Sequence, residues 1–154
     1  LSLSPTKDIN VAYRQPCPVM ALVHPDHPLA KKKSVSLAQL HPYPIALPEK
    51  NTTVRQLFDI CCSRTNLLFE PVLESNNIAP LSNFTQFGGG IHFGGEISCR
   101  HQISSHKIVA IPIKDRGMDI RNIEVQTLSG RTLPAAVKVF LDFLVNKMKS
   151  EEPL

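Results

Sequence analysis

The stretch that decides the fold is PIALPEKNTTVRQLFDICCSRT, residues 44–65. It opens with a short apolar run, Pro44–Leu47, which Pro48 closes, as expected of a short buried strand. The apolar residues that follow are Val54 and then Leu57, Phe58 and Cys61, which lie three, four and seven positions after it. This spacing places all four on one face of a helix. Thr53 and Gln56 have the spacing of a capping box, which predicts that this helix starts at Thr53. A strand followed by a helix is the repeating unit of α/β folds.

Strands and helices continue to alternate on both sides of this unit. Before it we expect a strand at Pro18–Val23 and one helical turn, Leu37–Leu40, capped by Ser36. The elements expected after it are a strand at Phe69–Leu73, a helix from Asn77 to Phe87, strands at Ile91–Phe93, Ile108–Ile113 and Asn122–Leu128, and a closing helix capped by Thr132. Residues 97–104 are compatible with a short helix. This alternation predicts an α/β fold around a mainly parallel sheet.

The composition is that of a globular chain. Of the 154 residues 42% are apolar and 19% are charged, which excludes wholesale disorder. No apolar run approaches the roughly 20 residues of a membrane span. The net charge is +4, but the run Lys31–Lys33 reads as a solvated loop, so we do not expect this chain to bind nucleic acid directly. The four cysteines are expected to be reduced and mostly buried, as in a cytoplasmic protein: Cys17, Cys61, Cys62 and Cys99.

The sequence lacks the usual patterns of a phosphate-binding loop, a zinc site and a reactive cysteine. Gly88–Gly90 is not followed by the lysine and hydroxyl residue of a phosphate-binding loop. Several histidines lie near Asp26 or Cys99, but without the paired spacing that marks a zinc site. Cys61 and Cys62 lie inside the expected helix and not at its start, where a thiolate would be stabilised. We therefore predict no catalytic residue, no metal and no cofactor.

Uncharged polar residues mark the starts of two expected helices. They are Asn51, Thr52 and Thr53 at the first helix and Asn76 and Asn77 at the second. Right-handed crossovers would bring both helix starts to the carboxyl edge of the sheet, where α/β folds bind ligands. Free N–H groups and the helix dipole make such starts suitable for a small anion. The alternative interpretation is that these residues only cap their helices.

Several motifs together carry a family resemblance. The sequence HPDHPLA at His24–Ala30 is followed by SVSLAQL at Ser34–Leu40, FEPVLES at Phe69–Ser75, GGI at Gly89–Ile91 and LPA at Leu133–Ala135. In this order and spacing, the chain resembles the effector-binding domain of LysR-type transcriptional regulators. One departure is Gly94–Gly95, which stands where the family often has Leu-Pro.

The resemblance implies two Rossmann-like lobes of the periplasmic-binding-protein type II kind. Residues 25–114 would form the second lobe, and residues 1–24 and 115–154 would form the remainder of the first lobe. The first lobe would be only partly present. The DNA-binding winged helix-turn-helix of the family has no counterpart in this sequence. Contact with DNA is therefore expected only through a domain outside this chain.

The resemblance also implies a function. The chain would belong to a bacterial, cytoplasmic regulator, would not be an enzyme and would not contact a membrane. A small polar or anionic effector would bind between the lobes and change the geometry of a dimer or tetramer. The positions that resemble the family's effector site are Asn51, Thr52, Thr53, Asn76, Asn77, Gly90 and His92. The helix Val54–Cys62 and the strand Phe69–Leu73 resemble its dimer surface.

Two other functions suit the same fold. A stand-alone solute-binding protein would share the two-lobed plan, but the four cysteines and the HPDHPLA loop favour a regulator. An α/β enzyme such as a dehydratase would need an acid–base pair, and no such pair stands out in the sequence.

Overall fold

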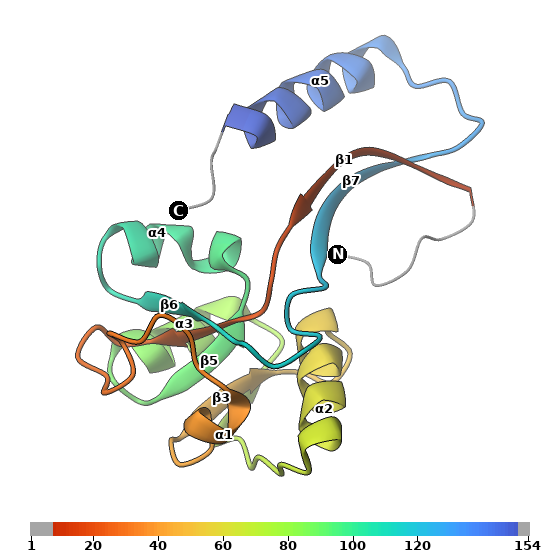
Figure 1. Ribbon diagram of the computed structural model, residues 1–154. Helices are drawn as coiled ribbons and strands as arrows, with labels where there is room; N and C mark the ends of the chain where they lie inside the picture. The colour runs from red at the N-terminus through yellow and green to blue at the C-terminus, as the bar shows by residue number, and fades with distance from the viewer. Residues whose placement is uncertain (1–7, 151–154) are drawn as a thin grey trace.

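The computed structural model describes residues 8–150 of the chain (Figure 1). The helices and strands in chain order are β1 (Ile9–Pro16), β2 (Met20–Val23), α1 (Leu37–Leu40), β3 (Ile45–Pro48), α2 (Thr53–Thr65), β4 (Leu73–Ser75), α3 (Ile78–Gln86), β5 (Ile91–Gly94), the 3-10 turn η1 (Glu96–Cys99), α4 (Arg100–Ser104), β6 (Val109–Pro112), β7 (Asn122–Leu128) and α5 (Ala135–Ser150). Within the described residues, no helix combines the length and the apolar character that crossing a membrane requires.

A five-stranded sheet forms the body of the molecule, with the strand order β4-β3-β5-β2-β6. Strand β3 is parallel to both β4 and β5, whereas β2 is antiparallel to β5 and β6. The expectation of a mainly parallel sheet therefore holds for all strands but β2. Because β2, at Met20–Val23, lies between β5 and β6 in this sheet, the body includes residues outside 25–114.

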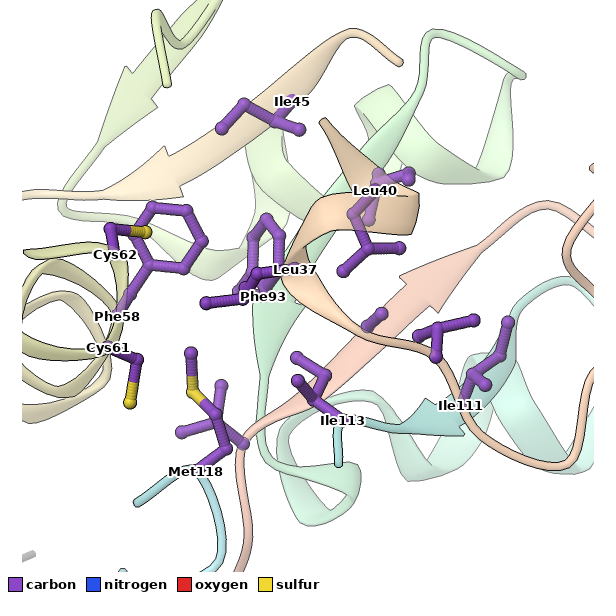
Figure 2. Packing of buried hydrophobic residues seen from close by; sticks show 14 of the residues in the cluster. Leu37, Leu40, Ile45, Phe58, Cys61, Cys62, Phe93, Ile111, Ile113 and Met118 are labelled. Carbon is purple, nitrogen blue, oxygen red and sulfur yellow. The ribbon is translucent and has the colours of Figure 1, made fainter. Parts of the chain in front are cut away.

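The sheet is covered on both faces. Alternate residues of β2 point to opposite sides, so Ala21 and Val23 pack in the larger core and Met20 and Leu22 in the smaller one. In the larger core, residues of α1 and α2 meet the sheet (Figure 2). The ring of Phe58 is 1% exposed, and its centroid lies 4.6 Å from that of Phe93 in β5.

A second, two-stranded sheet pairs β1 with β7 antiparallel, from Ile9 opposite Leu128 to Pro16 opposite Asn122. Figure 1 shows this ribbon extending from the body, with α5 beyond it. The apolar residues of α5 are half-buried at best, and Phe140 and Phe143 are 62% and 66% exposed. Helix α5 contacts the ribbon through the Tyr13 hydroxyl, which donates to the carbonyl oxygen of Met148 at 3.4 Å.

Several predicted boundaries were wrong. Helix α2 does start at Thr53 as predicted, but its capping residue is Thr52, because the Thr52 hydroxyl oxygen accepts from the Arg55 N–H at 3.2 Å. Strand β4 covers Leu73–Ser75 and not Phe69–Leu73. The Phe69 ring packs instead against Phe58, with the ring centroids 5.1 Å apart.

The two ends of the chain were also predicted incompletely. Helix α5 begins at Ala135, so Thr132 does not cap it. Strand β1 had not been predicted at all. The caps of the two other helices are confirmed, since Ser36 caps α1 and Asn77 caps α3.

A buried polar cluster joins β5 to the helices behind it. His92 is fully buried, and its Nδ1 lies 2.8 Å from the Thr85 hydroxyl of α3. Its Nε2 lies 3.5 Å from Cys99 Sγ, which in turn lies 3.4 Å from the Ser82 hydroxyl. Burial lowers the pKa of His92 to about 4, so the ring is neutral at physiological pH.

The first prediction concerns acid stability. The unfolded chain binds a proton at His92 near pH 6.5, whereas the folded chain resists protonation until about pH 4. The stability contributed by neutral His92 is therefore fully present above pH 6.5, and about 3 kcal/mol of it is lost as the pH falls to 4. Urea unfolding at several pH values should show this loss in the parent chain and a shallower loss in His92→Gln. The exposed control His101→Gln should behave like the parent, and equal slopes in all three chains would refute the assignment.

The second prediction concerns the larger core. Phe58→Ala removes a ring that is 1% exposed and should lower the free energy of unfolding by about 3–5 kcal/mol. The same change at Phe143, which is 66% exposed, should cost less than about 0.5 kcal/mol. Chemical denaturation of both variants measures the difference. Similar losses at the two positions would mean that α5 is packed in solution.

Candidate functional site

Two helix starts lie side by side at one edge of the five-stranded sheet. Pro48 and Ser75, the last residues of β3 and β4, are directly opposite each other. The pairing continues one residue further, where the Glu49 N–H donates to the Ser75 carbonyl oxygen at 3.3 Å. Helices α2 and α3 begin within a few residues of these strand ends. The structure therefore brings the two predicted groups of polar residues to the same edge.

The first helix start is held by a local turn. The Thr52 N–H and the Thr52 hydroxyl both donate to the Glu49 carbonyl oxygen, at 3.1 and 2.9 Å. Thr52 and Thr53 are half-buried, whereas Asn51 is exposed. Thr52 therefore acts as a structural cap, and the hydroxyl of Thr53 follows it in the first turn of the helix.

The second helix start is built in a similar way. The Asn77 side-chain oxygen accepts from the Ala79 N–H at 2.9 Å, and the Asn77 N–H donates to the Ser75 hydroxyl at 3.1 Å. Asn76 and Asn77 are both exposed. Pro80 occupies the third helical position, where an N–H would have no partner within the helix.

Arg55 connects the first helix start to the sheet. Its side chain is buried and binds Asp59 Oδ1 at 2.9 Å, Glu74 Oε1 of β4, and the Pro48 carbonyl oxygen at 3.3 Å. Burial alone would lower the pKa of Arg55, but the hydrogen bonds to Glu74 and Asp59 outweigh it and the pKa is raised. Sequence reasoning missed this residue, and its only sequence signal is the i, i+4 spacing to Asp59.

Gly90 and His92 lie elsewhere. Gly90 precedes β5 and packs against the carbonyl of Pro44, which precedes β3, so it lies at the amino edge of these parallel strands. The φ angle of Gly90 is +147°, and an added Cβ would collide with that carbonyl. His92 is enclosed beneath α3 and has no exposed surface. The carboxyl edge therefore gathers five of the seven predicted positions: Asn51, Thr52, Thr53, Asn76 and Asn77.

A cavity of about 210 Å³ opens where the β1–β7 ribbon meets the carboxyl end of β5. Its lining includes Pro16, Cys17, Met20, Glu96, Ile97 and Ile123. No local sequence pattern predicts this cavity, because its walls come from three separate parts of the chain: residues 15–20, residues 96–100 and Ile123.

The structure describes no arrangement typical of a metal site or a reactive thiol. Within residues 8–150, no three His, Cys, Asp or Glu side chains are close enough together to hold a metal ion. All four cysteines are free and buried, as predicted. Burial raises the pKa of Cys61 and Cys99, and it raises the pKa of Cys62 to about 12. These three thiols are therefore protonated at neutral pH.

Solved structures share this fold. The effector-binding domain of QuiR in complex with shikimate is 20% identical, with a TM-score of 0.70 over 95% of this chain and 68% of that one. The regulatory domain of Synechocystis PCC6803 CcmR in complex with 2-PG is 21% identical, with a TM-score of 0.74 over 96% of this chain and 71% of that one. The cofactor-binding domain of the Cbl transcriptional regulator is also 21% identical, with a TM-score of 0.66 over 96% and 66% of the two chains.

Sequence comparison gives the family directly. No curated protein sequence is significantly similar to this one. The LysR substrate binding domain, however, matches residues 9–149, which is nearly all of the chain. The resemblance inferred from the motifs is therefore confirmed, and the chain belongs to the LysR substrate-binding domain family.

Proposed function

We propose that the chain is the ligand-sensing regulatory domain of a bacterial, cytoplasmic LysR-type DNA-binding transcriptional regulator and not an enzyme. It would bind a small polar or anionic metabolite between two lobes. A separate DNA-binding domain would contact the DNA, and the effector would alter the geometry of a dimer or tetramer. The observation that carries this proposal is the meeting of two polar helix starts at one edge of the sheet.

The chemistry of this edge suits an anion. The N–H groups of a first helical turn lack partners within the helix, and the helix dipole places partial positive charge there. In the proposed site, Thr53, Asn51 and Asn76 add uncharged donors, while Thr52 and Asn77 hold the backbone in place. The solved relatives with shikimate and 2-PG support the class of ligand, because both compounds are organic acids.

Two lobes are part of the proposal. The body formed by residues 25–114 together with β2 would be the second lobe. The ribbon of β1 and β7 with helix α5, from the rest of residues 1–24 and from 115–154, would belong to the first lobe. Gly90 and His92 would then act only indirectly, through the packing of β5 against its neighbours.

Exposed apolar residues support self-association through α2 and the segment that follows it. Ile60, Leu68 and Val72 are 45%, 87% and 63% exposed. The three residues lie close together along the chain, and exposed apolar patches are typical of protein interfaces. This region coincides with the helix Val54–Cys62 and the stretch Phe69–Leu73, for which a dimer surface had been predicted.

Thr53→Val tests the effector site. Thermal unfolding of the parent chain with shikimate, 2-phosphoglycolate and related carboxylates should reveal a stabilising acid, by about 2.7 kcal/mol at one hundred times its Kd. The Thr53→Val variant should lose most of that stabilisation. The matched control is Thr65→Val, whose hydroxyl bonds to Cys61 and Cys62 carbonyl oxygens at the other end of α2 and should not matter. Equal stabilisation of all three chains would remove Thr53 from the site, and no stabilising acid would refute an anionic effector.

Leu68→Asp tests the proposed self-association. A charge at this apolar position should weaken the dimer at least about tenfold, because burying an unpaired carboxylate in an interface is costly. Sedimentation of the chain over a range of concentrations measures the dissociation constant. Phe87→Asp, at a residue that is 80% exposed and follows the last residue of α3, serves as the control and should leave the constant unchanged. The surface assignment fails if both variants behave alike.

A further inference from the structure

We infer that Arg121 is the charged anchor for the effector, and that the effector is a small organic anion with an apolar body that enters the cavity beside Cys17. This inference rests on the proposed function and adds to it the residue that supplies formal positive charge. The polar helix starts offer only partial charges, and the buried Arg55 is already neutralised by Asp59 and Glu74.

Arg121 is buried, and the described part of the chain gives it no counter-ion. The residue is 1% exposed, and neither Nε nor Nη1 of its side chain has a hydrogen-bond partner in that part of the chain. Nη2 donates to Cys17 Sγ at 3.4 Å, and sulfur is a weak acceptor. Within residues 8–150, no carboxylate forms an ion pair with Arg121. Arg55 at the same edge of the sheet has two.

A buried guanidinium in this state is an incomplete site. Burial lowers the pKa of Arg121 from the ordinary value of arginine, but a guanidinium in a protein keeps its charge at neutral pH. A buried charge without a partner is costly, whereas a carboxylate opposite it can accept two parallel hydrogen bonds. Arg121 therefore offers unused donors that suit an anion from outside the chain.

Arg121 lies at the same edge of the five-stranded sheet as the two helix starts. Its carbonyl oxygen accepts from the Cys17 N–H at 2.8 Å, where the ribbon joins the body. Its guanidinium lies against Gly95, immediately after the carboxyl end of β5. A Cβ at residue 95 would lie 2.6 Å from Cys17 Sγ and 2.7 Å from Arg121 Nη2. Only a glycine at this strand end leaves room for both side chains.

The cavity next to this pair defines the shape of the ligand. Cys17 lines the cavity and is also the residue whose sulfur contacts Arg121. Much of the remaining wall is apolar and comes from Pro16, Pro18, Met20, Ile97 and Ile123. An acid with an apolar ring would place the ring against this wall, and its carboxylate would replace the Cys17 thiol as the acceptor for Arg121.

The experiment compares cyclohexanecarboxylate with cyclohexanecarboxamide, which has nearly the same shape and no charge. Thermal unfolding should show that the acid stabilises the parent chain and that the amide does not. Arg121→Met should lower the affinity for the acid at least about tenfold, the loss expected for a hydrogen bond between charged groups. Arg121→Lys should keep part of the response. Arg14→Met is the matched control, because Arg14 is an exposed arginine of the ribbon that already binds Glu124.

A second measurement separates a binding role from a structural one. Without ligand, Arg121→Met should unfold at a higher temperature than the parent. The substitution replaces an unpaired buried charge with an uncharged side chain of similar shape. A lower unfolding temperature would show that Arg121 holds the fold together and would overturn the inference. Equal binding of acid and amide, no binding of the acid, or an undiminished response in Arg121→Met would also overturn it. The last result would mean that another cation, such as Arg100 of the cavity wall, holds the acid.

The Thr53→Val variant distinguishes this inference from the proposed function. If that variant loses the response to acids and Arg121→Met keeps it, the helix-start site stands and the assignment of Arg121 fails. If Arg121→Met loses the response and Thr53→Val keeps it, Arg121 stands and the helix-start site fails.

Discussion

The parallel pairing of β3 with β4 and β5 is the constraint on which the rest of this structure depends. It places the ends of three strands at one edge, and the chain leaves each of them into a helix or a helical turn. Arg55 fixes this arrangement chemically, because one buried guanidinium binds Asp59 on α2, Glu74 on β4 and the last carbonyl of β3. This charge network therefore adds a side-chain link to the backbone pairing that brings the two helix starts together.

The two buried arginines at this edge differ in one respect. Arg55 has two carboxylate partners, and Arg121 has none among the described residues. The fold supplies carboxylates to the buried guanidinium of Arg55 and could supply one to Arg121 in the same way. The absence of a carboxylate at Arg121 therefore says more about the role of this residue than its burial does. Its neighbours Cys17 and Gly95 enclose the side chain, and the Cys17 sulfur is only a weak acceptor for its guanidinium.

Local signals in the sequence were sufficient for much of the fold. Capping residues such as Ser36 and Asn77 act within three positions of themselves, so their helices could be predicted from spacing. Strand β1 could not be predicted, because it exists through its pairing with β7 more than a hundred residues later. The predicted strand at Phe69–Leu73 was wrong for the same reason. The Phe69 ring packs against Phe58 of α2, and the local sequence does not reveal this contact.

The candidate site shows the same division between local and distant information. The helix-start residues Asn51–Thr53 and Asn76–Asn77 could be found from the sequence, because a strand end followed by a polar cap is a local pattern. Arg121 could not, since its burial depends on Cys17 and Gly95, which reach it only through the tertiary fold. Residues such as Arg121 and Cys17, whose contacts depend on the tertiary fold, join the ribbon to the body. An anion bound to Arg121 would thus act where β7 and the body meet, which is the place from which a small change in geometry could reach the rest of a regulator.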